Sequence, residues 1–163
     1  MSLESLRGIV FDVDGVLTDG RIIYTDDGHE LKQFHVQDGA SIKQLMNHGV
    51  EVAIITGRRS PIVARRAREL GIEHLVQGAD AKQDALDQLI AAGFPDTELA
   101  AVGDDLQDLA LFSHPSVTTS ITVANGHPDV ITKADVVTQR SGGEGVVVEL
   151  ARAILIAQGK WPY

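Results

Sequence analysis

Two acidic side chains follow the first strongly apolar segment of the chain. Asp12 and Asp14 come directly after Gly8-Ile9-Val10-Phe11. Because Gly15 permits an abrupt bend, the two carboxylates can converge on one point instead of pointing to opposite faces of a strand. Converging carboxylates suit a hard cation, a shared proton, or both. Taken alone, the same residues fit an ordinary Asp-Gly turn equally well.

Further polar residues follow three later segments, and their types are complementary. They are, in chain order, Thr56, Gly57 and Arg58, then Lys82, then Asp104, Asp105 and Asp108. Carboxylates, a hydroxyl and an ammonium around one crevice suit phosphoryl transfer, where catalysis consists mainly of positioning and electrostatic stabilisation. Mg²⁺ held by Asp12 and Asp104 would offset the repulsion between an anionic nucleophile and a phosphate dianion. Lys82 and Arg58 would add positive charge.

The elements that position these residues alternate between strand and helix. Apolar segments predict strands at 8–11, 50–55, 74–76, 99–102, 120–123 and 135–137, and helices at 41–46, 60–70, 81–92, 109–112 and 146–158. Ser60 is the expected N-cap of the second helix, with Pro61 at its first position. This alternation predicts an α/β fold with a doubly wound, mostly parallel, Rossmann-like sheet. The carboxyl ends of its strands would face the ligand crevice.

A β-hairpin is predicted over about residues 20–36, beside Asp12. Two β-prone segments flank Asp26-Asp27-Gly28, a strong hairpin signal. Its apolar side chains are too many for a free two-stranded arm, which is marginal in water. They are Ile22, Ile23, Tyr24, Phe34 and Val36. We expect a neighbouring subunit to cover them, and folding back onto the same domain is the alternative.

Composition limits the class of protein. The 163 residues form one expected domain, 1–163, with 44% apolar content. A net charge of -9 without a basic stripe argues against nucleic acid and anionic membrane surfaces as partners. Zero cysteines fit a reducing compartment, and neither a membrane-spanning run nor a signal pattern is apparent. The expected location is therefore cytoplasmic. The six histidines lack zinc-ligand spacing.

Four motifs resemble the signatures of the haloacid dehalogenase superfamily of phosphohydrolases, in the order of that family. They are DVDGVLT at 12–18, ITGR at 55–58, Lys82, and GDDLQD at 103–108. The resemblance implies that Asp12 is the nucleophile and forms an aspartyl-phosphate, and that Asp14 is the general acid and base. It implies phosphate binding by Thr56, Gly57 and Lys82. It also implies Mg²⁺ ligation by Asp12, the Asp14 backbone carbonyl and Asp104, with Asp105 or Asp108 in support.

The spacing between the motifs is too short for the cap domain that most members of this superfamily carry. Thr18 and Thr56 are separated only by the hairpin, one helix and one strand, and Thr56 and Lys82 by still less. A site without a cap is open, so it accepts a bulky substrate or is closed by another subunit. The apolar hairpin favours closure by a subunit.

Longer segments of the sequence are similar to those of the 3-deoxy-D-manno-octulosonate 8-phosphate phosphatases. They include DDGHELKQFHVQDG, VAIITGRRSP and SGGEG. That similarity implies a Mg²⁺-dependent phosphomonoesterase for a small-molecule sugar phosphate. It also implies a homotetramer in which hairpins pack together and C-terminal tails, here residues 159–163, reach neighbouring sites. A plain frayed terminus is the alternative for this tail.

One loop departs from the pattern of those phosphatases. Gln139 and Glu144 stand where two arginines are usual, so another 2-keto-3-deoxy sugar acid phosphate, such as a nonulosonate 9-phosphate, is an alternative substrate. Arg58 and Arg66 are candidates for binding a substrate carboxylate, and Arg140 could substitute for a missing arginine.

Two other classes of protein fit the motifs less well. A response-regulator receiver would place its acceptor aspartate in the middle of the chain and its Ser/Thr and Lys late, which is not the order found here. A non-catalytic assembly domain of the same fold would have no need of the complete set Asp12, Asp14, Thr56, Lys82 and Asp104.

Overall fold

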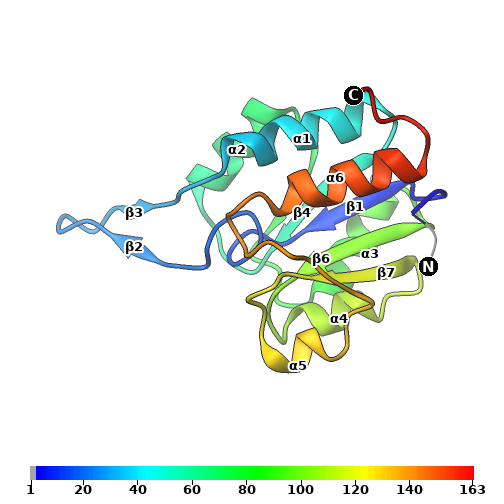
Figure 1. Cartoon of the computed structure of the whole chain (residues 1–163). Coiled ribbons are helices and arrows are strands. Elements are labelled where there is room, and N and C mark those ends of the chain that lie inside the picture. The colour runs from blue at the N-terminus through cyan, green and yellow to red at the C-terminus, as the bar shows by residue number, and fades with distance from the viewer. Residues whose placement is uncertain (1–2) are drawn as a thin grey trace.

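A six-stranded, wholly parallel sheet forms the centre of the molecule in the computed structural model, which describes residues 3–163 (Figure 1). The strand order is β5-β4-β1-β6-β7-β8. The strands are β1 (Gly8–Phe11), β4 (Glu51–Thr56), β5 (His74–Gln77), β6 (Leu99–Gly103), β7 (Val117–Thr122) and β8 (Val136–Val137). The predicted doubly wound α/β sheet is confirmed.

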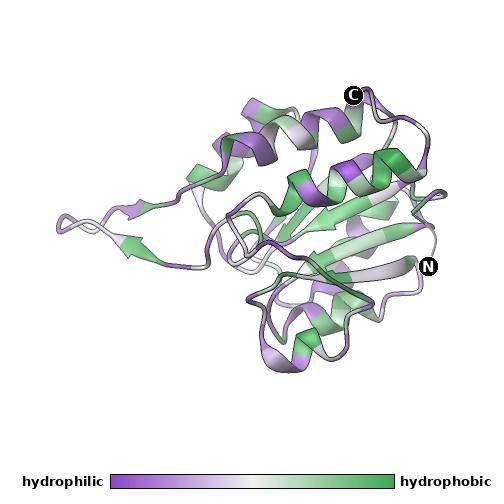
Figure 2. Cartoon of the chain, viewed as in Figure 1, coloured by the Kyte–Doolittle hydropathy of each residue, from purple (hydrophilic) through white to green (hydrophobic). Residues whose placement is uncertain are grey.

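Helices cover both faces of the sheet. They are α1 (Val36–Asn47), α2 (Pro61–Leu70), α3 (Lys82–Ala91), α4 (Asp108–Phe112), α5 (Pro128–Ile131) and α6 (Val146–Ala157). One buried cluster joins α1, α2 and α6 to one face, and another joins α3 and α4 to the opposite face. Apolar residues accordingly fill the central strands (Figure 2). The central strand β1 is buried at all four positions, because helices cover it on both sides.

The predicted hairpin is present and projects from the sheet's carboxyl edge (Figure 1). It pairs β2 (Ile23–Tyr24) with β3 (Glu30–Leu31) in antiparallel register. The paired strands are shorter than the apolar segments suggest, because the chain leaves the pairing after Leu31 and enters α1 at Val36. Between β1 and β4 the structure places only this hairpin and α1, which leaves no cap domain in that interval.

A few local features differ from the sequence expectations. The single turn of α5 was not predicted, and β7 begins three residues earlier than expected. Pro61 opens α2 as predicted, but the Ser60 hydroxyl makes no capping hydrogen bond. A buried aspartate instead caps α6 from a distance, because Asp38 Oδ1 accepts hydrogen bonds from the backbone N–H groups of Val147 and Val148.

The C-terminal tail lies on its own domain, at the end of the molecule opposite the hairpin (Figure 1). Trp161 is partly buried against the core cluster that contains α6. Lys160 Nζ donates a 2.9 Å hydrogen bond to the backbone carbonyl of His48, after the end of α1. In this chain the tail therefore contacts its own helices and lies far from its own carboxyl edge of the sheet.

Candidate active site

Sheet register brings the predicted residues to one edge. Phe11 of β1 pairs with Ile54 of β4 and with Val102 of β6, so the residues that follow these strands emerge together. They surround a cavity of about 460 Å³, lined by Asp12, Asp14, Gly20, Thr56, Gly57, Arg58, Ala79, Asp80, Lys82, Asp104, Asp105, Gln107 and Asp108. A wider hollow of about 620 Å³ lies at the amino ends of the strands and contains none of the predicted site residues.

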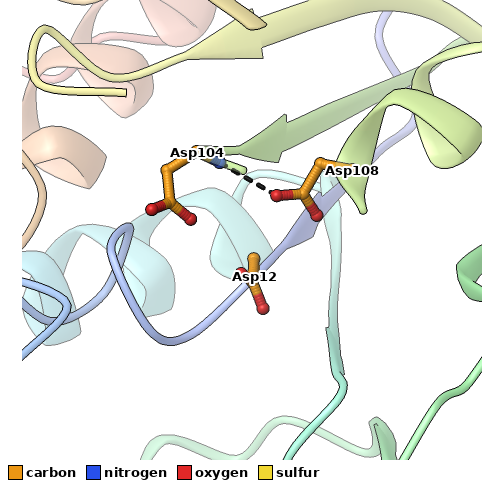
Figure 3. A group of neighbouring side chains, drawn as sticks. All are labelled: Asp12, Asp104 and Asp108. Atoms are coloured by element: carbon orange, nitrogen blue, oxygen red, sulfur yellow. Dashed lines mark hydrogen bonds between the residues drawn. The ribbon is translucent and has the colours of Figure 1, made fainter. Parts of the chain in front are cut away.

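Three carboxylates converge within this cavity. Asp12, Asp104 and Asp108 each offer one oxygen, and these oxygens lie within 4.8 Å of one another (Figure 3). Asp12 is fixed at the end of β1, where its backbone N–H donates a 3.0 Å hydrogen bond to the carbonyl of Val102. The convergence arises from two adjacent parallel strands, β1 and β6, that end at the same level.

Lys82 lies between two of these carboxylates. Its Nζ is 3.0 Å from Asp12 Oδ1 and 2.6 Å from Asp108 Oδ1, and its side chain is only 4% exposed. Burial opposes the charged amine, but the two carboxylates prevail and raise the pKa of Lys82. Burial raises the pKa of Asp12 to about 6, although Lys82 lowers it in part. The charged amine of Lys82 therefore lies against Asp12, the expected nucleophile.

Asp108 organises the loop after β6. Its Oδ2 accepts hydrogen bonds of 2.9 Å and 3.1 Å from the backbone N–H groups of Asp104 and Asp105. With Oδ1 on Lys82, both oxygens of Asp108 already have partners. The Asp105 carboxylate instead accepts from the backbone N–H of Leu106. Asp108 belongs to the group of converging carboxylates and Asp105 does not, so Asp108 is the better placed of the two candidates for supporting a metal.

Asp104 has a carboxylate oxygen without a partner in the described part of the chain. Its Oδ1 is buried and has no hydrogen-bond partner within residues 3–163. Burial, followed by the charges of Asp12, Asp108 and Asp105, raises its pKa to about 7. Gly15, with φ of +96°, keeps this space open, since a Cβ there would lie 2.0 Å from Asp104 Oδ2. A hard divalent cation beside Asp12 and Asp104 would supply the missing partner and offset the crowded negative charge.

Asp14 faces the same cavity and is held by residues that the sequence reasoning missed. Lys32 Nζ lies 2.5 Å from Asp14 Oδ1 and 3.0 Å from Glu30 Oε1. Burial favours neutral Lys32, but the hydrogen bonds to the two carboxylates raise its pKa. A signal was available, because Glu30 and Lys32 are two residues apart on an extended segment and therefore share a face.

The predicted phosphate-binding and substrate-binding residues divide into two groups. Thr56, Gly57 and Arg58 line the cavity, as Lys82 does. Arg58 Nη2 lies 3.4 Å from Glu30 Oε1, and its buried Nε has no hydrogen-bond partner among the described residues. Arg66 lies outside this cavity, with its guanidinium 5.7 Å from the centre of the Phe34 ring and 3.7 Å from Glu69. Its role toward a substrate stays a prediction.

The loop that contains Gln139 and Glu144 packs against the segment that follows Asp14. The N–H of Gly143 donates to the carbonyl of Val16, and a Cβ at Gly142 would lie 1.8 Å from the Gly15 carbonyl oxygen. Glu144 is exposed, while Arg140 Nη1 donates to the backbone carbonyl of Glu144. Arg140 does not line the cavity in this chain.

Comparison with known proteins shows which family this chain resembles. A family model of haloacid dehalogenase-like hydrolases matches residues 74–150. The 3-deoxy-D-manno-octulosonate 8-phosphate phosphatase of Escherichia coli strain K12 is 43% identical over 158 residues, which cover 96% of this chain and 83% of that enzyme.

Solved structures are similar over nearly the whole chain. The Yersinia pestis phosphatase of the same name superposes with a TM-score of 0.92 at 42% identity, covering 97% of this chain and 85% of that one. The Moraxella catarrhalis phosphatase, solved with magnesium ion, phosphate ion and KDO, gives a TM-score of 0.89 at 42% identity. The match covers 96% of this chain and 90% of that one.

Among the described helices, none has the length and apolar character needed to cross a bilayer. The ordered motifs, their convergence at one edge of the sheet, and the identity that extends over nearly the whole chain point to one group. The chain belongs to the haloacid dehalogenase-like hydrolases, in the family of the 3-deoxy-D-manno-octulosonate 8-phosphate phosphatases.

Proposed function

We propose that this protein is a Mg²⁺-dependent phosphomonoesterase that hydrolyses 3-deoxy-D-manno-octulosonate 8-phosphate to the free sugar acid and phosphate. The observation that carries the proposal is the buried contact of Asp12 with Lys82, beside the partnerless oxygen of Asp104, in a cavity at the carboxyl edge. Relatives with that named activity are 43% identical to the chain.

The first half-reaction transfers the phosphoryl group to Asp12. An oxygen of the Asp12 carboxylate attacks phosphorus, and the bond from phosphorus to the sugar oxygen breaks. The leaving oxygen takes a proton from Asp14, which leaves Asp14 as a carboxylate. Lys82 stabilises the charge that develops on the phosphoryl oxygens, with Thr56 and the Gly57 backbone as neutral donors. All these residues line one cavity.

The second half-reaction releases phosphate. Asp14, now a carboxylate, takes a proton from water while the water oxygen attacks phosphorus. The bond from phosphorus to the Asp12 oxygen breaks, which restores the Asp12 carboxylate and frees phosphate. The proton that Asp14 gave to the leaving oxygen is thus replaced from water, so no external acid or base is consumed.

Mg²⁺ is the proposed cofactor, held by Asp12 and Asp104 with the Asp14 backbone carbonyl, while Asp108 orients the loop. When bound, it supplies positive charge that lets an anionic carboxylate approach an anionic phosphate ester. The Moraxella catarrhalis relative was solved with this ion.

The carboxylate of an acidic sugar needs a cation of its own, separate from those that bind the phosphate. Arg58 lines the cavity and has a partnerless Nε, which supports it as that cation. Gln139 and Glu144, in place of two arginines, keep a nonulosonate 9-phosphate as the second candidate substrate.

We further propose that the protein acts as a homotetramer in the cytoplasm. The exposed apolar hairpin supports assembly, since Tyr24 is 64% exposed and Ile22, Ile23 and Leu31 are also exposed. Arg66 stays a candidate for a substrate carboxylate, and the tail at 159–163 is the segment that we propose reaches a neighbouring site in the tetramer.

A substrate panel tests the proposal. Phosphate release is measured with octulosonate 8-phosphate, nonulosonate 9-phosphate and hexose phosphates, with Mg²⁺ and with excess chelator. We expect the octulosonate ester to give the highest kcat/KM and chelator to abolish turnover. Preference for a neutral hexose phosphate, or full activity in chelator, would contradict the assignment.

A further inference from the structure

One charged side chain of the hairpin segment, that of Lys32, reaches back to Asp14 at the active site. Lys32 follows β3 directly, yet its side chain is only 2% exposed, whereas the neighbouring Leu31 is 49% exposed. Burying an ammonium group is costly unless it is paired and hydrogen-bonded. Lys32 meets that requirement with Asp14 and Glu30, so its position is specified by those two contacts.

Glu30 connects this lysine to a second cation. Its Oε1 lies 3.0 Å from Lys32 Nζ and 3.4 Å from Arg58 Nη2. Arg58 Nε in turn lies 4.0 Å from Asp14 Oδ2. Asp14 is therefore held on its Oδ1 side by Lys32 and faces Arg58 on its Oδ2 side, with Glu30 joining the two cations.

Lys32 and Glu30 do not line the cavity, whereas Asp14 and Arg58 do. Any effect of Lys32 on the reaction must therefore pass through Asp14, which it contacts directly, or through Glu30 to Arg58. An aspartate has two rotatable side-chain bonds, and proton transfer needs its oxygen at hydrogen-bond distance from the leaving oxygen.

We propose that Lys32 is a positioning residue, which orients the Asp14 carboxyl group for proton transfer and so makes the hairpin part of the catalytic apparatus. The inference rests on the proposed function, because Asp14 needs orientation only if it protonates a leaving oxygen. Loss of Lys32 lets the Asp14 side chain rotate away from the ester, although substrate binding and attack by Asp12 remain.

Leaving-group dependence distinguishes this role from a merely structural one. An alkoxide from a sugar phosphate needs a proton as it departs, whereas 4-nitrophenolate departs with little help. For Lys32→Met we expect kcat/KM for octulosonate 8-phosphate to fall about 10- to 100-fold, with KM within about twofold. For 4-nitrophenyl phosphate we expect kcat/KM to fall by less than about threefold.

Two controls sharpen the measurement. Lys133→Met removes an exposed lysine that does not line the cavity, and it should leave both esters unaffected. Asp14→Asn with Lys32→Met should be no slower on the sugar ester than Asp14→Asn alone, because the two residues act as one unit. If Lys32→Met fails to fold, Glu30→Gln removes one anchor of the lysine and should give a smaller effect with the same leaving-group dependence.

The outcomes separate the two proposals. If the wild type hydrolyses neither ester, the proposed function fails and this inference with it. If the wild type prefers another alkyl phosphate of the panel, that ester replaces the octulosonate ester in the comparison. Equal losses on both esters, or no loss on either, in a folded Lys32→Met protein would overturn the positioning role while leaving the phosphatase assignment intact.

Discussion

The carboxyl edge of the sheet and the hairpin that projects from it differ in almost every physical respect. At the edge, charged groups are buried and paired, as Lys82 is between Asp12 and Asp108. On the hairpin, apolar groups face solvent, as Tyr24 does. Each pattern is unfavourable in an isolated soluble chain, since buried charge and exposed apolar area both cost free energy. The buried charges are explained by a reaction that needs charge in one place. The exposed apolar side chains are explained by a surface that would cover the hairpin.

Lys32 joins the two regions, because it lies on the hairpin and contacts Asp14. Any surface that covers the hairpin would also restrict the segment that carries this lysine. If the proposed assembly and the proposed proton transfer both occur, they are physically linked, and the following variants separate them.

The largest expected effect is at the nucleophile. Asp12→Asn should lower phosphate release by roughly 10⁴-fold or more, because an amide oxygen is a poor nucleophile and no aspartyl-phosphate can form. The measurement is a phosphate-release assay on the folded variant, with the fold checked by circular dichroism. The hairpin and its assembly should be unchanged. Surviving turnover would refute the assignment of Asp12.

The next effect concerns Asp104 and metal. Its folded pKa of about 7 lies above the ordinary value of 3.8, so the carboxyl group binds its proton more tightly in the folded state. The metal-free protein should therefore lose stability as pH rises from about 4 to about 7. Asp104→Asn removes this buried charge and should raise the metal-free unfolding free energy at pH 8 by about 1–2 kcal/mol.

Mg²⁺ provides the matching control for Asp104. Wild-type protein should gain thermal stability when Mg²⁺ is added at pH 8, and Asp104→Asn should gain little. Thermal melts with and without the ion make the comparison. An unchanged gain in the variant would place the ion elsewhere.

A third variant addresses the hairpin alone. Tyr24→Ser should raise the dissociation constant of the tetramer about tenfold, since an exposed aromatic side chain is a typical interface anchor. The unfolding free energy of the dissociated chain should change by less than about 0.5 kcal/mol. Sedimentation at several concentrations measures the first quantity. A wild type that is monomeric at micromolar concentration would disprove the assembly argument. The control is Ile156→Ser, which changes an exposed apolar side chain on α6 and should leave the dissociation constant of the tetramer unchanged.

The smallest effect is expected at the loop that packs on the segment after Asp14. Glu144→Arg should shift kcat/KM among acidic sugar phosphates by about threefold to tenfold, because it reverses a charge on an exposed position. Hydrolysis of 4-nitrophenyl phosphate should hardly change. Equal shifts for both kinds of ester would show that the loop does not select the substrate.

Much of the site could be predicted because parallel strands carry their following residues to one edge. The order of strands and helices along the chain was enough to assign four residues to one cavity, without knowledge of how the strands are arranged in the sheet. They are Asp12, Thr56, Lys82 and Asp104. The hairpin was predictable from Asp-Gly between β-prone segments. The position of the Arg66 side chain outside the cavity could not be predicted in this way. The direction of a side chain on α2 depends on how that helix packs, and it packs with Arg66 over Phe34.

The sequence by itself determined the chemical groups, their chain order and the edge at which they meet, since these follow from strand periodicity and connection rules. Only the tertiary structure decided that Asp108 rather than Asp105 contacts Lys82, and that Lys32 contacts Asp14. Those contacts join residues 26 and 18 positions apart. Such pairings depend on loop geometry at the scale of a hydrogen bond, about 3 Å, which local sequence preferences do not fix.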